Sequence, residues 1–297
     1  MSLNAVKMLG ISITTSPKKE ILEHLQKYLL QNPKSQIQNP KKPVKPLVIV
    51  TPNPEQIIYA QKNKHFAEIL NQADVAIPDG IGIVLAGRFL QETGDRGQGT
   101  EIKGRIAGVE LMEDLVAMAA ERGYPIALIG GRGRVAVEAL ECLRQKYPGL
   151  VGWAQEPGEL QLGNLGDVSD LGEKIQKTNT RLVFVGLGAP KQEFFIERLS
   201  LSLRGASLRA TRQSHVKTKQ EIASPSVRSR NDNLIMMSVG GSFDIISGRT
   251  LRAPLFIRNV GLEWLWRLAR QPWRWRRQLA LVKFFWLVLK TKEQVQA

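Results

Sequence analysis

Cysteine and histidine are scarce in this sequence. The chain of 297 residues has one cysteine and three histidines, so we expect neither a disulfide framework nor a Cys/His metal cluster. Cys142 lies in an Ala- and Leu-rich helical pattern, which favours a buried structural thiol over a nucleophile. The sequence also lacks an Asp-x-Asp pair, so it offers no obvious carboxylate holder for a divalent cation. We therefore expect neither a metal nor another cofactor.

Long hydrophobic runs are also missing. The longest covers residues 279–289, and Lys283 interrupts it. This run is well short of the roughly 20 residues that span a bilayer, which favours a segment that lies on a membrane over one that crosses it. The N-terminus lacks the basic start, apolar run and small-residue cleavage site of a signal peptide. We therefore expect a cytoplasmic protein.

The net charge of +15 comes from two short stretches. Residues 249–292 hold eleven Lys or Arg residues against one acid, Glu263, and residues 199–233 hold seven against two. Five of the six tryptophans are interleaved with the cations of the first stretch, a mixture typical of amphipathic helices that bury aromatic rings at lipid headgroups. Nucleic acid could also attract such a composition. The basic residues cluster in one C-terminal segment that also has a Leu/Val/Phe/Trp face. This clustering favours an anionic membrane surface as the partner, and we expect no nucleic acid.

Apolar runs alternate with helical periodicities before this C-terminal stretch. The runs predict strands at 8–13, 47–51, 74–78, 125–130, 181–186 and 234–239. The periodicities predict helices at 54–72, 109–123, 134–147 and 190–203. Such alternation, with strongly apolar strands, predicts a Rossmann-like α/β fold in which helices cover both faces of a mostly parallel sheet.

We expect the chain to have two parts. Residues 1–250 form the α/β core, and residues 251–297 form an appendage of amphipathic helices that docks on the membrane. Within the core, residues 31–46 contain four prolines and no periodicity, which indicates a long loop. The Ser-, Arg- and Lys-rich residues 199–233 separate a predicted helix from a predicted strand, and we expect a disordered insertion there.

Polar side chains and glycine turns follow five of the predicted strands. Ligands bind at the carboxyl ends of the strands in an open parallel sheet. Glycine lets the backbone approach a ligand, and helix N-termini bind anions. The sequence therefore predicts a site for a polar, phosphorylated ligand at this edge. Its candidate residues are Thr51, Asn53, Asp79, Gly130, Gly131, Lys191, Gln192 and Asp244.

Two other functions stay open at this point. Residues 131–136 have a Gly-x-Gly-x-x-Ala pattern after a strand, with Glu156 at about the spacing of a ribose-binding acid, which would suit a nucleotide-binding oxidoreductase. A non-catalytic adaptor for a membrane or nucleic acid is the second alternative. Each motif is weak alone, because Asp79 and Gly80 are also ordinary turn residues. Their joint occurrence at strand ends favours a functional site.

Six longer strings run in order along nearly the whole chain. They are TPNPE at 51, ADVAIPDGIGIVLAGR at 73, GRIAGVELM at 104, GLGAPKQE at 186, VGGSFDIISG at 239 and RAPLFIRNVGLEWLWRLARQPWRWRR at 252. Together they resemble the WecG/TagA/CpsF family of bacterial glycosyltransferases. The resemblance implies a metal-independent, inverting transferase of cell-envelope polysaccharide or glycolipid synthesis. Such an enzyme moves a sugar, often of the N-acetylmannosamine type, from a UDP-sugar to a polyprenyl-diphosphate-linked sugar at the cytoplasmic face of the membrane.

The resemblance also implies a general base. Asp79 matches the family's proposed base, and Thr51 and Asn53 match polar residues that line the same pocket. The chemistry of the residues agrees, because inverting transfer needs one base to take the proton of the acceptor hydroxyl, and a partly buried carboxylate suits that role.

Further residues are implied to bind the substrates. Gln192 and Asp244 match residues near the nucleotide-sugar, and Arg105 belongs to the GRIAGVELM string. Arginines can stabilise the charge that grows on a leaving diphosphate through bidentate contacts. The arginines of the appendage, which the resemblance implies folds over the site when membrane is present, are Arg267, Arg274 and Arg277.

Overall fold

A computed structural model describes residues 3–30, 46–91, 101–158, 160–162, 164–216, 233–272 and 275–296 of the chain. Except for its last residue, the predicted Pro-rich loop at 31–46 lies outside the described residues. Residues 217–232 of the basic stretch lie outside them as well.

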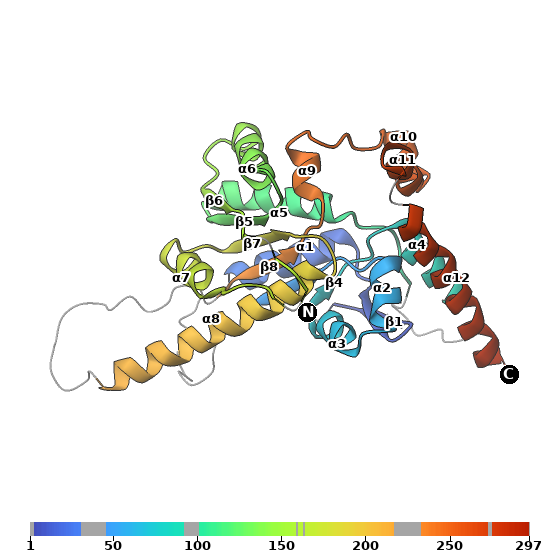
Figure 1. Cartoon of the computed structure of the whole chain (residues 1–297), viewed down its shortest axis with the longest axis horizontal. Helices are drawn as coiled ribbons and strands as arrows, with labels where there is room; N and C mark the ends of the chain where they lie inside the picture. The colour runs from blue at the N-terminus through green and yellow to red at the C-terminus, as the bar shows by residue number, and fades with distance from the viewer. Residues whose placement is uncertain are drawn as a thin grey trace.

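The core is a sheet of six parallel strands in the order β4-β3-β8-β7-β5-β6 (Figure 1). The central strands β5, β7 and β8 are buried along their whole length, as expected for a parallel sheet that is covered on both faces. The predicted α/β fold is therefore confirmed. The strands are β3 (Leu47–Val50), β4 (Val75–Ala76), β5 (Ile126–Gly130), β6 (Gly152–Gln155), β7 (Leu182–Gly186) and β8 (Ile235–Ser238).

Helices pack on both faces of this sheet, because successive side chains of a strand point to opposite sides. Leu128 and Phe184 face one group of helices, and their neighbours Ile129 and Val183 face the other. Figure 1 shows α5 and α6 above the sheet and α8 below it. The first group is α1 (Lys18–Leu30), α5 (Gly108–Arg122), α6 (Val135–Lys146) and α9 (Ser242–Ile246). The second group is α7 (Ser169–Lys177) and α8 (Lys191–Val216).

A separate hydrophobic cluster lies at the β4 edge of the sheet. It joins Ile57, Phe66 and Ile83 to Phe284 and Val288 near the C-terminus. The elements in this cluster are β1 (Ala5–Met8), β2 (Ile11–Thr14), α2 (Pro54–Ala60), α3 (Lys64–Gln72), α4 (Ile81–Gln91) and α12 (Trp275–Gln296).

The predicted appendage is helical. It consists of α10 (Leu255–Asn259), α11 (Glu263–Arg270) and α12, which runs along the right side of Figure 1 to the C-terminus. Phe284 and Val288 of α12 are buried, with 0% and 1% of their surface exposed, so this helix contributes to the core as well. Among the residues that the structure describes, no helix is long and apolar enough to cross a membrane.

The disordered insertion predicted at 199–233 is wrong over its first part. Helix α8 does not end at residue 203 but continues to Val216. Leu199 and Leu203 are buried against strands β7 and β8. The Ser- and Arg-rich composition concealed apolar residues at helical spacing, which decide the structure here.

Three other local predictions need correction. The run 8–13 forms an antiparallel hairpin of β1 and β2 rather than one strand, because Leu9 and Gly10 turn the chain with positive φ angles of 47° and 80°. The helix predicted at 54–72 is two helices, and Asn63 caps the second by accepting from the backbone N–H of Phe66. Strand β6 was missed, because its residues are only partly buried and form no apolar run.

Candidate active site

A pocket of about 650 Å³ opens at the carboxyl edge of the sheet, within the range of small-molecule sites. Residues that follow β3, β4, β7 and β8 form most of its polar side, together with Arg105 from the loop before α5 and with Glu263 and Arg267 from α11. Apolar residues of α4, α11 and α12 form the other side, so core and appendage both contribute walls. The main polar lining residues are Thr51, Asn53, Gln56, Asp79, Arg105, Gln192, Glu263 and Arg267.

Asp79 follows β4 and points its carboxylate at the start of α5. Its backbone N–H donates to the carbonyl of Pro52 at 3.2 Å, and its carboxylate accepts from the backbone N–H of Gly108. Burial raises the pKa of Asp79, and Arg105 and Arg267 oppose that rise. The side chain is therefore a carboxylate with increased basicity that lines the pocket.

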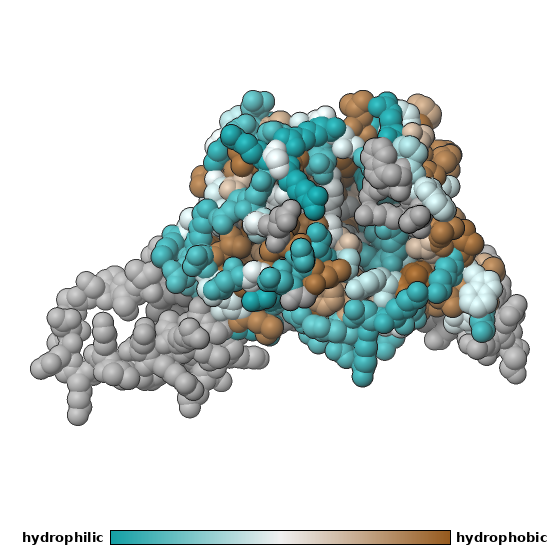
Figure 2. All heavy atoms as spheres, in the orientation of Figure 1, coloured by the Kyte–Doolittle hydropathy of each residue, from teal (hydrophilic) through white to brown (hydrophobic). Residues whose placement is uncertain are grey.

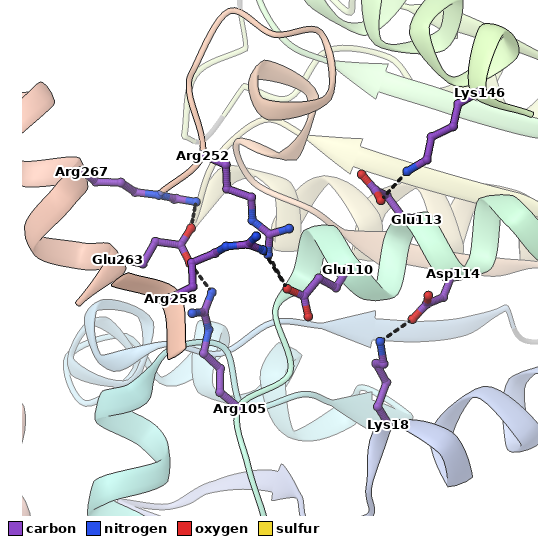
Figure 3. Close-up of polar contacts among 10 residues, drawn as sticks. All are labelled: Lys18, Arg105, Glu110, Glu113, Asp114, Lys146, Arg252, Arg258, Glu263 and Arg267. Carbon is purple, nitrogen blue, oxygen red and sulfur yellow. Dashed lines mark hydrogen bonds and ion pairs between the residues drawn. The ribbon is translucent and has the colours of Figure 1, made fainter. Parts of the chain in front are cut away.

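Two arginines flank a buried carboxylate beside Asp79. Nη2 of Arg105 lies 2.5 Å from Oε2 of Glu263, and Nη2 of Arg267 lies 3.1 Å from Oε1 (Figure 3). Burial acts to raise the pKa of Glu263, but Arg105 and Arg267 together hold it below its usual range. With Glu263 ionised, the three side chains carry one net positive charge at the pocket wall.

A second ionic cluster holds the appendage to helix α5. Oε1 of Glu110 accepts from Arg252 at 2.5 Å and from Arg258 at 3.5 Å (Figure 3). Both arginine side chains are mostly buried. This cluster and the Arg105–Glu263 pair therefore clamp the segment 252–263 over the core from two sides.

Thr51 and Asn53 both line the pocket, as predicted. Thr51 is buried and lies close to Gly108, where an added Cβ would approach the Thr51 methyl group to 3.2 Å. Asn53 is the N-cap of α2, and its Oδ1 accepts from the backbone N–H of Gln56 at 3.0 Å. The Asn53 side chain therefore also shapes the loop that carries it.

Gln192 lines the pocket, whereas Lys191 and Asp244 do not. The Gln192 amide is held on both sides: Nε2 donates to Oε1 of Glu193 at 2.7 Å, and Oε1 accepts from the backbone N–H of Gly240 at 2.9 Å. Lys191 is the first residue of α8, and Asp244 lies within α9.

Gly130 and Gly131 do not line the pocket either. Gly130 is the last residue of β5 and Gly131 follows it, and β5 lies on the far side of β7 from β3, β4 and β8. A Cβ at Gly130 would lie 2.6 Å from the carbonyl oxygen of Gly186, and the N–H of Gly131 donates to that oxygen at 2.9 Å. These contacts give the glycines a packing role. The carboxylate of Glu156, the acid of the dinucleotide alternative, accepts from the backbone N–H of Arg134.

Of the three predicted appendage arginines, Arg267 is the one whose side chain is described. Arg274 lies outside the described residues. Arg277 lies in α12, but the structure describes only its backbone. Within the described part of the chain, no group of three or more His, Cys, Asp or Glu residues is placed to hold a metal ion.

Sequence reasoning missed three residues of this region. The sequence did hold a signal that could have identified Glu263, since it is the one acid among the bases of residues 249–292. Gln56 and Glu193 had none, because a polar residue near a helix start normally faces solvent. Both are buried here, and they bond to each other at 3.0 Å.

A parallel α/β sheet with a carboxylate and arginines in a strand-end pocket defines an enzyme that acts on a polar substrate. Comparison with known proteins identifies its class. The chain belongs to the glycosyl transferase WecG/TagA/CpsF family, whose model matches residues 6–209 and 217–296. It is therefore a glycosyltransferase.

Three relatives have the same description, N-acetylglucosaminyldiphosphoundecaprenol N-acetyl-beta-D-mannosaminyltransferase. The protein of Bacillus spizizenii is 31% identical over 242 residues, which cover 82% of this chain and 78% of that protein. The protein of Bacillus subtilis is 29% identical over 246 residues, with 83% and 80% covered. A Staphylococcus aureus protein is 28% identical over 250 residues, with 84% and 82% covered.

Proposed function

We propose that this protein transfers a sugar of the N-acetylmannosamine type from a UDP-sugar to a polyprenyl-diphosphate-linked sugar in cell-envelope polysaccharide or glycolipid synthesis. The names of the relatives support the sugar and the acceptor. The observation that carries the proposal is the pocket itself. It combines Asp79, Arg105 and Arg267 on its polar side with an apolar wall from α4 and α12.

Asp79 is the general base of the proposed reaction. Its carboxylate takes the proton of the acceptor hydroxyl while that oxygen bonds to the anomeric carbon, and the bond from this carbon to the UDP oxygen breaks on the opposite face. The sugar configuration is therefore inverted. Burial raises the pKa of Asp79 and so strengthens it as a base, while Arg105 and Arg267 favour its ionised form.

Arg105 and Arg267 stabilise the diphosphate of the departing UDP. Both line the pocket beside Asp79, and preorganised cations in such a site act most strongly on charge that develops during the reaction. This arrangement supports a metal-independent transfer. Arg274 and Arg277 stay predicted participants from the family resemblance.

The appendage is the proposed contact with an anionic membrane surface, which places the protein peripherally on the inner face of the cell membrane. Figure 2 shows hydrophobic residues gathered at its upper right, over α10 and α11. Phe256 of α10 has 70% of its surface exposed. The exposed apolar residues of α12 are Trp275, Leu279, Val282, Trp286 and Leu289.

The apolar residues of α12 surround much of the helix. Phe284 and Val288 face the core cluster, and Leu281, Val282 and Phe285 line the pocket. At 3.6 residues per turn, Trp286 projects opposite to the core face, and Leu289 lies between Trp286 and the pocket-lining Phe285. One helix can therefore contact core, substrate pocket and lipid together, which supports coupling of membrane docking to the site.

A transfer assay tests this function. Purified protein is incubated with single UDP-sugars and with polyprenyl-diphosphate N-acetylglucosamine in anionic vesicles, and the lipid-linked disaccharide is measured. We expect product with UDP-N-acetylmannosamine or a related UDP-hexose. The matching donor should also stabilise the fold by about 2.7 kcal/mol at 100 times its dissociation constant. Absence of product with every UDP-sugar would contradict the proposal.

A further inference from the structure

A buried polar cluster lies at the polar wall of the pocket and consists of Glu193, Gln56, Gln192 and Ser238. Each has 3% or less of its surface exposed. They come from three separate elements, the starts of α8 and α2 and the end of β8. Burying polar groups costs free energy unless they are hydrogen-bonded, so the bonds within this cluster decide how it is arranged.

The carboxyl of Glu193 is the centre of those bonds. Its Oε1 accepts from Nε2 of Gln192 at 2.7 Å and from Nε2 of Gln56 at 3.0 Å. Because this oxygen only accepts, both amides must turn their NH2 groups toward it. Their carbonyl oxygens then point the other way.

Those two oxygens accept from the backbone of the pocket loops. Oε1 of Gln56 accepts from the N–H of Asn53 at 3.2 Å, and Oε1 of Gln192 accepts from the N–H of Gly240 at 2.9 Å. One carboxyl thereby ties together the loops that follow β3, β7 and β8. Asn53, Gln56, Gln192 and Gly240 line the pocket, whereas Glu193 does not.

We propose that Glu193 is a positioning residue for sugar transfer, which holds the polar wall of the donor pocket through Gln56 and Gln192. The proposal rests on the function proposed above, because it takes the pocket to be the UDP-sugar site. Glu193 touches neither substrate. It acts by fixing the direction of two amides whose other ends shape the pocket.

We expect the acceptor geometry of Glu193 to matter more than its charge, because the single oxygen Oε1 accepts from both amides. Burial raises the pKa of Glu193 to about 7, although Gln192, Ser238 and Gln56 each lower it. Both charge forms are therefore accessible near neutral pH, and an oxygen in the position of Oε1 accepts in either form.

Two substitutions separate geometry from charge. Glu193→Gln keeps the length and one accepting oxygen but removes the charge. Glu193→Asp keeps the charge but is shorter, so its oxygen cannot reach both amides as Oε1 does. We expect Glu193→Asp to raise the donor KM about tenfold, as for the loss of one buried hydrogen bond, with little change in the acceptor KM. Glu193→Gln should keep the donor KM close to that of the wild type.

Two controls on the same helix exclude a general loss of structure. Glu197 lies one turn further along and pairs with His65 at the surface, at 3.0 Å, so Glu197→Gln should change nothing. Leu199 is fully buried in the hydrophobic cluster below the sheet. Leu199→Ala should lower the melting temperature but leave the donor KM unchanged.

The proposal is overturned if Glu193→Asp keeps the wild-type donor KM, or if Glu193→Gln is impaired more than Glu193→Asp. A failure of the proposed function has a different signature, since the wild type would then transfer no sugar. In that case the positioning role of Glu193 is tested by UDP binding. The UDP dissociation constant should rise in Glu193→Asp but not in Glu193→Gln. Equal constants in all variants would reject the positioning role.

Discussion

Arg105 and Glu263 are 158 residues apart in the sequence, yet Nη2 of Arg105 lies 2.5 Å from Oε2 of Glu263. This pair joins the loop before α5 to the first residue of α11. Glu263 also accepts from Arg267 at 3.1 Å. One of the contacts that attach the appendage to the core thus also holds Arg105 and Arg267 beside Asp79.

Replacing Glu263 should loosen the appendage and disturb the site together. Glu263→Gln leaves Arg105 and Arg267 without their carboxylate, and breaking a buried ion pair costs about 3 kcal/mol. We expect faster amide hydrogen exchange across residues 255–270 and a lower rate of transfer. Glu173→Gln, which removes an exposed pair with Lys177 on α7, is the matched control and should change neither. Unchanged exchange in Glu263→Gln would contradict the clamp.

Asp79→Asn tests the general base. The amide keeps the size of the side chain but cannot take the acceptor proton, so turnover should fall by roughly 100-fold or more. The affinity for UDP should be kept, which isothermal titration can measure. Asp170→Asn on α7, an exposed residue that does not line the pocket, serves as the control. Near-normal turnover of Asp79→Asn would remove Asp79 from this role.

Metal chelation tests how the diphosphate charge is stabilised. If Arg105 and Arg267 supply that stabilisation, excess EDTA should leave the rate of transfer unchanged. Added magnesium or manganese should not increase it. Loss of activity in EDTA with recovery on addition of either ion would show that the arginines are not sufficient.

Substitutions on opposite faces of α12 should have opposite effects. Trp286→Ser with Leu289→Ser removes exposed apolar groups, so binding to anionic vesicles should weaken while the melting temperature stays the same. Phe284→Ala removes a ring that is 0% exposed and should destabilise the fold by about 3 kcal/mol. Vesicle sedimentation and thermal unfolding give the two measurements. Equal vesicle binding by the double variant and the wild type would place the lipid contact elsewhere.

The pH dependence of stability should change in Glu193→Gln. The folded-state pKa of Glu193 is raised from its ordinary value of 4.5 to about 7, so the folded state binds more protons than the unfolded chain between these values. Its contribution is therefore fully present below pH 4.5 and is lost as the pH rises through 7, by about 3 kcal/mol. Urea unfolding between pH 5 and pH 8 should show a smaller loss in the variant. Identical losses would show that Glu193 is already ionised at the lower pH.

Much of the fold could be predicted from the sequence, because its signals are local. Apolar runs such as 181–186 mark buried strands wherever they occur, and turns such as Asp79-Gly80 follow directly from residue type. The same local signals placed Thr51, Asn53, Asp79 and Gln192 at strand ends, and all four line the pocket. These local signals failed at residues 199–203, which were assigned to the disordered insertion although Leu199 and Leu203 belong to the core.

The order of the strands was decided by the tertiary structure. Five strand ends carried equally suggestive residues, but β5 lies beyond β7, so Gly130 and Gly131 stay outside the pocket. Strand order depends on how whole faces pack, and no short stretch of sequence encodes it. The same holds for the two acids that organise the site. The burial of Glu193 and the pairing of Glu263 with Arg105 depend on residues that are far away along the chain. Electrostatic attraction and hydrogen bonding depend on the distance between groups in space, and the fold alone sets that distance.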